Sequence, residues 1–252
     1  MHIPGGMDWQ LILDPVGHPG TRNMAIDESM LAEAGRSGAA LLRLYRFTPP
    51  CLSFGRNEPA LARYDRARIE QLGLDVVRRP TGGRAVWHEH ELTYAVAAPI
   101  AAFGSLRESY HAIHERLAQA LRQLGVAATL ALKPSARAGL DRGACFASPS
   151  GGEVVVDGKK VIGSAQVRHG TAFLQHGSIL LDGSQDLIDA ISYQPSTSGS
   201  TTLSTIAGRA IGFQEVAEAI VDAWGVAFAT SAPYHLLPPS TVFSDPTWTW
   251  RR

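Results

Sequence analysis

The stretch RRPTGGRAVWHEHELTYAV, residues 78–96, sets arginines and a double glycine in front of an apolar segment that is typical of a buried strand. Glycine lets the backbone come close to a ligand, and guanidinium groups beside bare amides suit the oxygen of a carboxyl group, a phosphate or a thioester. The pattern indicates a ligand site around Gly82 and Gly83, with Arg79 and Arg84 beside them. A tight turn between strands accounts for the glycines equally well, so both interpretations stay open at this point.

Cys145 is the second residue whose type could carry chemistry. It lies in RGACFASPSGGE, residues 142–153, whose glycine and serine content predicts a loop. A cysteine attacks acyl groups as the thiolate, which nearby positive charge stabilises, but most cysteines are small core residues. Residue type alone leaves both roles open. Cys51 leads into an apolar stretch, and we expect it to lie in the core.

Two adjacent lysines, Lys159 and Lys160, begin a stretch that becomes apolar. Successive side chains of a strand point to opposite faces, so only one of the two can point inward, and alternation alone does not say which. The histidines show no coherent metal-ligand spacing. His111 and His114 are three residues apart in an expected helix, but no third ligand is evident, and we expect no zinc site.

The elements that must position these residues follow from the hydrophobic pattern. Apolar residues at helical spacing predict helices, and apolar runs bounded by glycine or proline predict strands. Asp157-Gly158 is expected to form a two-residue hairpin turn, because both positions tolerate positive φ. We expect helices at residues 21–34, 59–73, 105–125 and 213–225, and strands at residues 40–47, 51–55, 152–156, 159–168 and 171–181.

Composition limits the kinds of protein that the chain can be. Lysine plus arginine (23) equals aspartate plus glutamate (23) at a pI near 7.1, which argues against nucleic acid as the main partner. Two cysteines are too few for a disulfide scaffold, and we see no secretory pattern, so we expect a cytoplasmic protein. No apolar run approaches the roughly 20 residues of a spanning helix, so we expect no membrane insertion.

Four motifs, in the order RRPTGGRAVWHEHELTYAV, CFASPS, GKKVIGSAQVR and LQHGSILL, closely resemble the lipoate-protein ligase A and octanoyltransferase family. The resemblance extends from NMAIDESML to TTLSTIAGR, and the family shares its core fold with biotin-protein ligases. It implies an α/β (α+β) fold with a mixed, largely antiparallel sheet flanked by helices. It also implies one catalytic domain over residues 1–252, with a proline-rich C-terminal tail from about residue 233.

Within the family, the sequence is most similar to the cysteine-dependent protein octanoyltransferases. Arg84 stands where the ligases have a third glycine, and those transferases use a cysteine placed as Cys145 is here, although SFGRNEP, residues 53–59, is at least as similar to ligases. The resemblance implies an octanoyltransferase of lipoate assembly that requires no cofactor. The alternatives are a lipoate-protein ligase, which would need ATP and Mg²⁺, and an amidotransferase that moves octanoyl between lipoyl domains.

The resemblance also implies roles for residues and partners. Cys145 would take the acyl group from octanoyl-[acyl carrier protein], and Lys160, matched to the family's lysine before VIGSA in preference to Lys159, would stabilise the oxyanion. The acceptor would be a lysine of a lipoyl-accepting protein, either the glycine cleavage H protein or the lipoyl domain of a dehydrogenase E2 component. The double glycine would line the acyl slot, and Arg84 would narrow the space that a nucleotide uses. We expect His88 and His176 to give structural support. The implied substrate-binding residues are Arg79, Thr81, Gly82, Gly83, Arg84, His88, Gly163, Ser164, Ala165 and His176.

Overall fold

The computed structural model describes residues 3–4, 6–131, 151–195, 201–230 and 241–251. Its strands are β1 Trp9–His18, β2 Ala40–Phe47, β3 Cys51–Phe54, β4 Asp75–Arg78, β5 Val86–His88, β6 Glu91–Pro99, β7 Thr129–Leu130, β8 Val154–Val156, β9 Lys159–Lys160, β10 Ile162–His169, β11 Ala172–Leu180 and β12 Phe228–Thr230. Its helices are α1 Gly20–Ser37, α2 Ala60–Arg63, α3 Arg66–Gln71, α4 Ile100–Phe103, α5 Leu106–Gln123, α6 Asp186–Ala190, α7 Leu203–Ala207, α8 Phe213–Trp224, the 3₁₀ helix η1 Thr241–Ser244 and α9 Pro246–Thr249.

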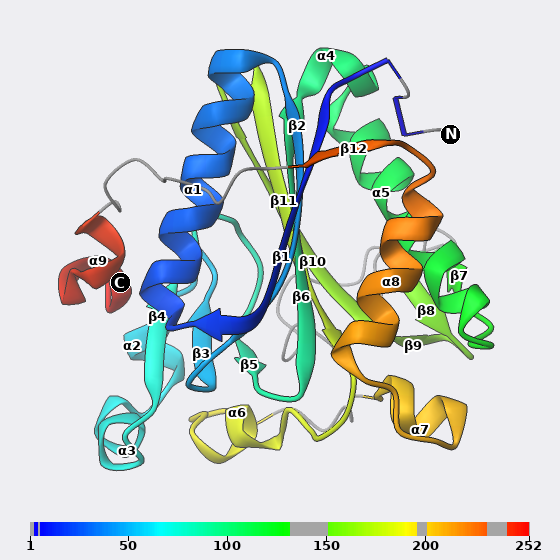
Figure 1. The fold of residues 1–252 in the computed structure, drawn as a ribbon. Coiled ribbons are helices and arrows are strands. Elements are labelled where there is room, and N and C mark those ends of the chain that lie inside the picture. The colour runs from blue at the N-terminus through cyan, green and yellow to red at the C-terminus, as the bar shows by residue number, and fades with distance from the viewer. Residues whose placement is uncertain (1–2, 5, 132–150, 196–200, 231–240, 252) are drawn as a thin grey trace.

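The main sheet has the strand order β10-β11-β6-β2-β1-β12. The pairings β10·β11, β11·β6 and β6·β2 are antiparallel, whereas β1 runs parallel to both β2 and β12. Figure 1 shows this sheet at the centre of the molecule, with α1 on one side and α5 and α8 on the other. The predicted fold class, a mixed and mostly antiparallel sheet flanked by helices, is confirmed.

Strand alternation gives the main sheet two apolar faces. Tyr94 and Val96 of β6 contribute to the core beneath α5 and α8, whereas Ala95 and Ala97 contribute to the core beneath α1. This is the period-two pattern of a strand that is buried on both sides. Neighbouring residues of β6 therefore serve different sides of the sheet, and the same holds for its partner β11.

Two smaller sheets complete the described part of the fold. The first has the order β4-β3-β5, with β3 parallel to β4 and antiparallel to β5, and its core includes Leu52, Phe54 and Trp87. The second is the antiparallel set β7-β8-β9. The expected hairpin joins β8 to β9, where Asp157 has a φ of 49° and Gly158 a φ of 74°. Both turn residues thus have the positive φ that a two-residue turn of this kind requires.

Several expected elements differ in extent. Helix α1 continues through Gly35 and ends before Gly38, whose φ of 78° is left-handed. Residues 59–73 form two short helices because Tyr64 leaves the helix to bridge Ser192, and the side chain of Asp65 then caps α3. The single strand expected at residues 159–168 is divided into β9 and β10, which belong to different sheets. Strands β2 and β3 also belong to two different sheets.

The C-terminal segment is docked onto the second sheet. Arg78, at the end of β4, donates from Nε to the carbonyl oxygens of Trp248 at 2.9 Å and Thr249 at 3.0 Å. Trp248 Nε1 donates in return to the carbonyl oxygen of Arg78 at 3.1 Å. Part of the expected tail, residues 241–251, is therefore folded, whereas residues 231–240 lie outside the described residues.

Candidate functional site

A cavity lies between the main sheet and the sheet β4-β3-β5. Its wall draws residues from α1, β2, β5, β6, β10 and β11, and the surface that it exposes is mostly apolar. Met24, Phe47 and Val86 contribute hydrocarbon to this wall. The wall includes six of the residues predicted to bind substrate, which are Arg79, His88, Gly163, Ser164, Ala165 and His176.

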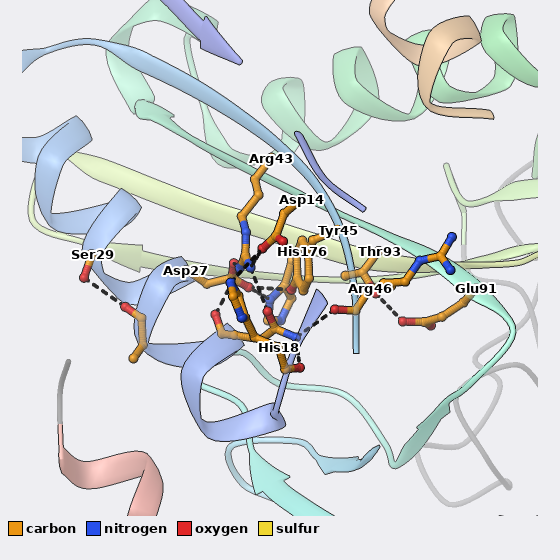
Figure 2. A network of polar contacts seen from close by, with 12 residues as sticks. Asp14, His18, Asp27, Ser29, Arg43, Tyr45, Arg46, Glu91, Thr93 and His176 are labelled. Carbon is orange, nitrogen blue, oxygen red and sulfur yellow. Dashed lines mark hydrogen bonds and ion pairs between the residues drawn. The ribbon is translucent and has the colours of Figure 1, made fainter. Parts of the chain in front are cut away.

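Asp27 is the centre of the polar network beside the cavity, and Figure 2 shows its neighbours converging on it. This fully buried carboxylate accepts a hydrogen bond from Tyr45 Oη at 2.9 Å, and it lies 2.8 Å from His176 Nδ1 and 3.1 Å from Arg43 Nη1. His176 Nε2 is 2.6 Å from the hydroxyl oxygen of Thr81. The series of hydrogen bonds from Asp27 through His176 to Thr81 thus connects α1 and β11 to the glycine-rich segment.

Burial sets the protonation state of this network. Burial lowers the pKa of His176, against the opposing effect of its bond to Asp27. Burial also raises the pKa of Tyr45 well above its ordinary value, and the negative charge of Asp27 adds to that rise. His176 is therefore a neutral ring with its proton on Nδ1, facing the carboxylate, while Thr81 donates to Nε2. The arrangement fixes the ring in place.

A second buried carboxylate, Glu91 on β6, organises another part of the wall. It accepts hydrogen bonds from the hydroxyl groups of Thr93 and Ser178, and His88 Nδ1 lies 2.8 Å from it. His88 Nε2 lies 2.6 Å from Ser53 Oγ. His88 thus has the same arrangement as His176, with an acid at one nitrogen and a hydroxyl group at the other.

Arg79 stabilises the glycine-rich turn from the inside. Its buried guanidinium donates to the carbonyl oxygens of Gly82 at 3.1 Å and Arg84 at 2.9 Å. It also donates to the carbonyl oxygen of Ser53 at 2.9 Å and to the hydroxyl group of Ser53 at 2.6 Å. This arginine therefore holds backbone carbonyl groups of the turn in addition to lining the cavity.

The four remaining residues predicted to bind substrate, Thr81, Gly82, Gly83 and Arg84, are not part of the cavity wall as the described residues define it. Gly83 has a φ of 95°, which glycine adopts readily and other residues do not. A side chain at Gly55 would collide with the carbonyl oxygen of Gly83, so the close backbone approach is made to Gly55. A tight turn accounts for this geometry, and contact of the double glycine with an acyl chain stays a prediction.

The two lysines of β9 have opposite environments. Lys159 is exposed, whereas Lys160 is only 5% exposed and donates to Glu153 Oε1 at 2.8 Å. The expectation that one lysine points inward is confirmed, and that lysine is Lys160, although it does not belong to the described cavity wall. Cys145 lies outside the described residues. Cys51 is fully buried, and burial raises the pKa of its thiol well above the ordinary value, which confirms its place in the core.

Sequence reasoning missed the two buried acids that hold the wall together. Asp27 lies three residues after Met24 and three before Met30, within the apolar stripe of α1. A carboxylate on a buried helix face needs partners, and this position was an available signal. Glu91 and Thr93 lie in an otherwise apolar strand, which is a similar signal. Their partners come from distant segments and cannot be deduced from local sequence.

Two further observations concern the described residues only. They contain no group of three or more His, Cys, Asp or Glu side chains that could hold a metal ion. None of their helices combines the length and the apolar character that a bilayer-spanning segment requires.

Comparison with known sequences gives consistent matches. Residues 19–225 match the family described as the lipoyl protein ligase A/B catalytic domain. The chain is 45% identical to the octanoyltransferase LipM of Carboxydothermus hydrogenoformans over 64% of this chain and 61% of that relative. It is 39% identical to LipM of Kyrpidia tusciae, with 81% of this chain and 82% of the relative covered. It is 36% identical to LipM of Symbiobacterium thermophilum, with 92% and 89% covered.

Solved structures share the fold. Protein Ta0514 of T. acidophilum with bound lipoic acid superposes with a TM-score of 0.77 at 18% identity, covering 97% of this chain and 100% of that chain. A lipoate-protein ligase A bound with ATP has a TM-score of 0.68 at 19% identity, covering 93% and 90%. At these identities the likeness establishes the architecture, and the sequence relatives carry the functional argument.

Proposed function

Because the chain belongs to the lipoyl protein ligase A/B catalytic domain family, we propose that it transfers an octanoyl group through a cysteine thioester to a lysine of a lipoyl-accepting protein. Relatives that are 36–45% identical are octanoyltransferases, and the protein is accordingly an octanoyltransferase, an acyltransferase enzyme. A lipoyl-accepting protein is the class of partner that goes with this activity. The donor, the nucleophile and the particular acceptor are the proposed parts.

The observation that carries this proposal is the chemistry of the cavity wall. Tyr45 and His176 direct polar atoms to Asp27, and His88, Thr93 and Ser178 direct theirs to Glu91. Apolar contact with this wall therefore leaves none of these groups unpaired, which suits an aliphatic chain. Each methylene that an acyl chain buries against the wall contributes about 0.8 kcal/mol.

We assign the first half-reaction to Cys145 and octanoyl-[acyl carrier protein]. The Cys145 thiolate attacks the thioester carbonyl, a new C–S bond forms, and the bond to the carrier thiolate breaks. In the second half-reaction the acceptor lysine amine attacks the acyl-enzyme, a C–N bond forms, and the C–S bond to Cys145 breaks. The proton of the amine passes to the Cys145 sulfur. Exchange between two thioesters is close to balanced and amide formation drives the second half, so the proposed reaction consumes no ATP.

Lys160 is the proposed partner of the oxyanion in both half-reactions. It is a cation withdrawn from solvent and oriented by Glu153, and a charge in such surroundings acts more strongly than one in water. One well-aimed donor to a developing oxyanion contributes about 3–4 kcal/mol to the transition state.

The experiment offers the purified enzyme three acyl sources in parallel: octanoyl-[acyl carrier protein], octanoate with ATP and Mg²⁺, and an octanoylated lipoyl domain. Intact-protein mass spectrometry records which source labels the enzyme. We expect a hydroxylamine-sensitive octanoyl adduct from the carrier protein, absent in Cys145→Ala and present in Cys51→Ala.

The other outcomes separate the alternatives. Adenylate formation from octanoate would support a ligase, and labelling by the octanoylated lipoyl domain alone would support an amidotransferase. Near-normal turnover by Cys145→Ala would overturn the thioester route.

A further inference from the structure

Ser164, Tyr94 and His114 form a hydrogen-bonded group that the proposed reaction has not used. Ser164 Oγ lies 2.7 Å from Tyr94 Oη and 2.8 Å from His114 Nε2. His114 Nδ1 lies 2.7 Å from the carbonyl oxygen of Gly152, and Gln175 donates to Tyr94 Oη at 3.0 Å. His114 is fully buried on α5, so a helix on one side of the main sheet reaches the strand that carries Ser164.

The register of the sheet brings the two hydroxyl groups together. Ser164 on β10 is paired with Gly177 on β11, and Gly177 is paired with Tyr94 on β6. Residues paired across strands direct their side chains to the same face. A Cβ atom at Gly177 would lie 2.6 Å from Ser164 Oγ and 2.8 Å from Tyr94 Cε1. The bare backbone of Gly177 therefore leaves the space in which Ser164 and Tyr94 meet.

The carbonyl group of Gly152 fixes the direction of these hydrogen bonds. A carbonyl oxygen can only accept, so His114 carries a proton on Nδ1. The pKa of His114 is lowered to about 4, chiefly by burial and in part by the charge of Lys160, while the bond to Gly152 acts in the opposite direction. The ring is therefore neutral, and Nε2 is an acceptor.

Ser164 is the donor to that acceptor. Tyr94 Oη is 3.5 Å from His114 Nε2, whereas Ser164 Oγ is 2.8 Å from it. If Ser164 donated to Tyr94 instead, Tyr94 would have to donate over the longer distance. In both arrangements the hydroxyl proton of Ser164 is used within the group, for a hydrogen bond either to His114 or to Tyr94. With Ser164 donating to His114, Tyr94 donates to Ser164 Oγ, so Ser164 has one remaining oxygen lone pair and no proton to offer to a ligand.

This group lies beside Lys160. Gly152 directly precedes Glu153, which accepts the hydrogen bond of Lys160, and the charge of Lys160 acts on His114. Ser164 follows Lys160 by four residues, belongs to the cavity wall and keeps part of its surface exposed. His114 is thus bonded to both segments that flank the proposed oxyanion partner.

We propose that Ser164 accepts a hydrogen bond from an N–H group of the attacking lysine amine, and that His114 is a positioning residue that commits Ser164 to this accepting role. The inference rests on the proposed function. A serine with a committed proton cannot donate to the acyl oxyanion, and the octanoyl group has no N–H to offer, whereas the amine does. With one N–H directed to Ser164, the lone pair of the amine is free to attack the carbonyl carbon. The amine proton is still transferred to the Cys145 sulfur, and Ser164 keeps its own proton.

The test measures the two half-reactions separately by single turnover. The first is acylation of Cys145 by octanoyl-[acyl carrier protein], and the second is transfer from the isolated acyl-enzyme to a lipoyl domain. We expect Ser164→Ala and His114→Leu to slow the first reaction far less than the second, because the committed hydroxyl group of Ser164 has no hydrogen bond to offer to the octanoyl group. We expect the saturating rate of the second to fall about tenfold, the size that loss of one transition-state hydrogen bond gives, with half-saturation by the lipoyl domain unchanged.

Ser29→Ala is the matched control, because it removes a half-buried hydroxyl group of a different helix, α1, one that donates to the carbonyl oxygen of Ala25, and it should change neither rate. If His114→Leu does not fold, Ser164→Ala decides the question, since its side chain is partly exposed.

Three outcomes would overturn the inference. Equal slowing of both half-reactions would assign the group a purely structural role. Slowing of the first half alone would mean that the N–H group belongs to an amide of the carrier-protein arm. Failure of the wild type and the Ser29→Ala control to become acylated at all would overturn the proposed function itself, and the inference with it.

Discussion

Lys160 and its neighbour Lys159 are a matched pair at the scale of single residues. Lys160 is buried against Glu153, whereas Lys159 is exposed. Replacing each lysine by alanine removes the same side chain from two different environments, so any difference in activity reports on the position of the lysine. We expect Lys160→Ala to lower kcat for octanoyl transfer by about 100- to 1,000-fold, as removal of one oxyanion donor does, and Lys159→Ala to leave it within about twofold. Steady-state assays with octanoyl-[acyl carrier protein] measure both.

A stability effect has to be separated from this loss, because Lys160→Ala leaves the Glu153 carboxylate buried without its cation. The double variant Lys160→Met/Glu153→Gln removes both charges. It should recover thermal stability and remain inactive, whereas recovery of activity would show that Lys160 only neutralises Glu153.

His114 makes the stability of the protein depend on pH. Its pKa is lowered to about 4 in the folded state, so the unfolded chain takes up this proton first as the pH falls. The contribution of neutral His114 is complete above the ordinary histidine pKa and is lost as the pH falls toward 4. Buried His176, whose pKa is also lowered, acts in the same direction. We expect His114 to decrease the free energy of unfolding by up to about 1.4 kcal/mol per pH unit between about pH 6.5 and 4, and His176 to add to this decrease as the pH falls below the ordinary histidine pKa.

Urea titrations at several pH values measure this slope. His114→Gln should make it shallower, and His169→Gln, at an exposed position near the end of β10, should not. An unchanged slope in His114→Gln would show that other groups control the acid sensitivity.

At the scale of elements, the strongly periodic segments were predicted well from the sequence. The apolar stripe of α5, the central part of α1 and the Asp157-Gly158 hairpin all follow from local pattern, because the residues that determine them are close in the chain. The errors occur where distant segments decide. Tyr64 interrupts a helical pattern to reach Ser192, and β10 leaves the direction of β9 to join β11.

The same distinction applies to the candidate site. Six predicted residues lie in the cavity wall. Those of β10 and β11 lie within strands that the sequence pattern predicted, whereas Arg79 and His88 were identified from the motif alone. The acids Asp27 and Glu91 were not found, because a buried carboxylate is explained only by partners such as His176 or Ser178 on other elements. Register across the sheet, which pattern alone does not supply, decides those pairs.

Gly177 gives a test of that register. An added methyl group would lie 2.5 Å from the carbonyl oxygen of Gly163 and 2.6 Å from Ser164 Oγ, so β10 would have to move away from β11. We expect Gly177→Ala to lower the free energy of unfolding by about 1–3 kcal/mol, as overpacking does, and to slow octanoyl transfer. Gly6→Ala, at an exposed position with nothing within 4 Å of an added Cβ, is the control in denaturant titrations. Equal stability of the two variants would contradict the close contact of β10 and β11.

At the scale of the whole molecule, the site depends on contacts between segments from both ends of the chain. The cavity wall takes residues from α1 near the N-terminal end and from β10 and β11 far along the sequence. The glycine-rich turn rests on Gly55, and the loop that contains Gly55 is itself held by Arg78. Arg78 also holds the C-terminal segment, so the last residues of the described chain support the loop beneath the turn.

Arg78 is therefore the residue through which this long-range support is best tested. Its fully buried guanidinium donates to the carbonyl oxygens of Gly55 at 2.7 Å and Glu58 at 2.8 Å, in addition to those of the C-terminal segment. Arg78→Met keeps most of the side-chain volume but removes the guanidinium donor from these carbonyl groups, of which those of Gly55 and Glu58 each keep one backbone N–H donor. We expect it to lower the free energy of unfolding by at least about 3 kcal/mol, since several hydrogen bonds from a charged group are lost and each contributes about 1.5–3 kcal/mol. Urea denaturation measures the change, and Arg68→Met, at an exposed arginine of α3 bonded to Gln71, is the control. A variant at Arg78 as stable as this control would show that the C-terminal segment and the loop at Gly55 are held by other contacts.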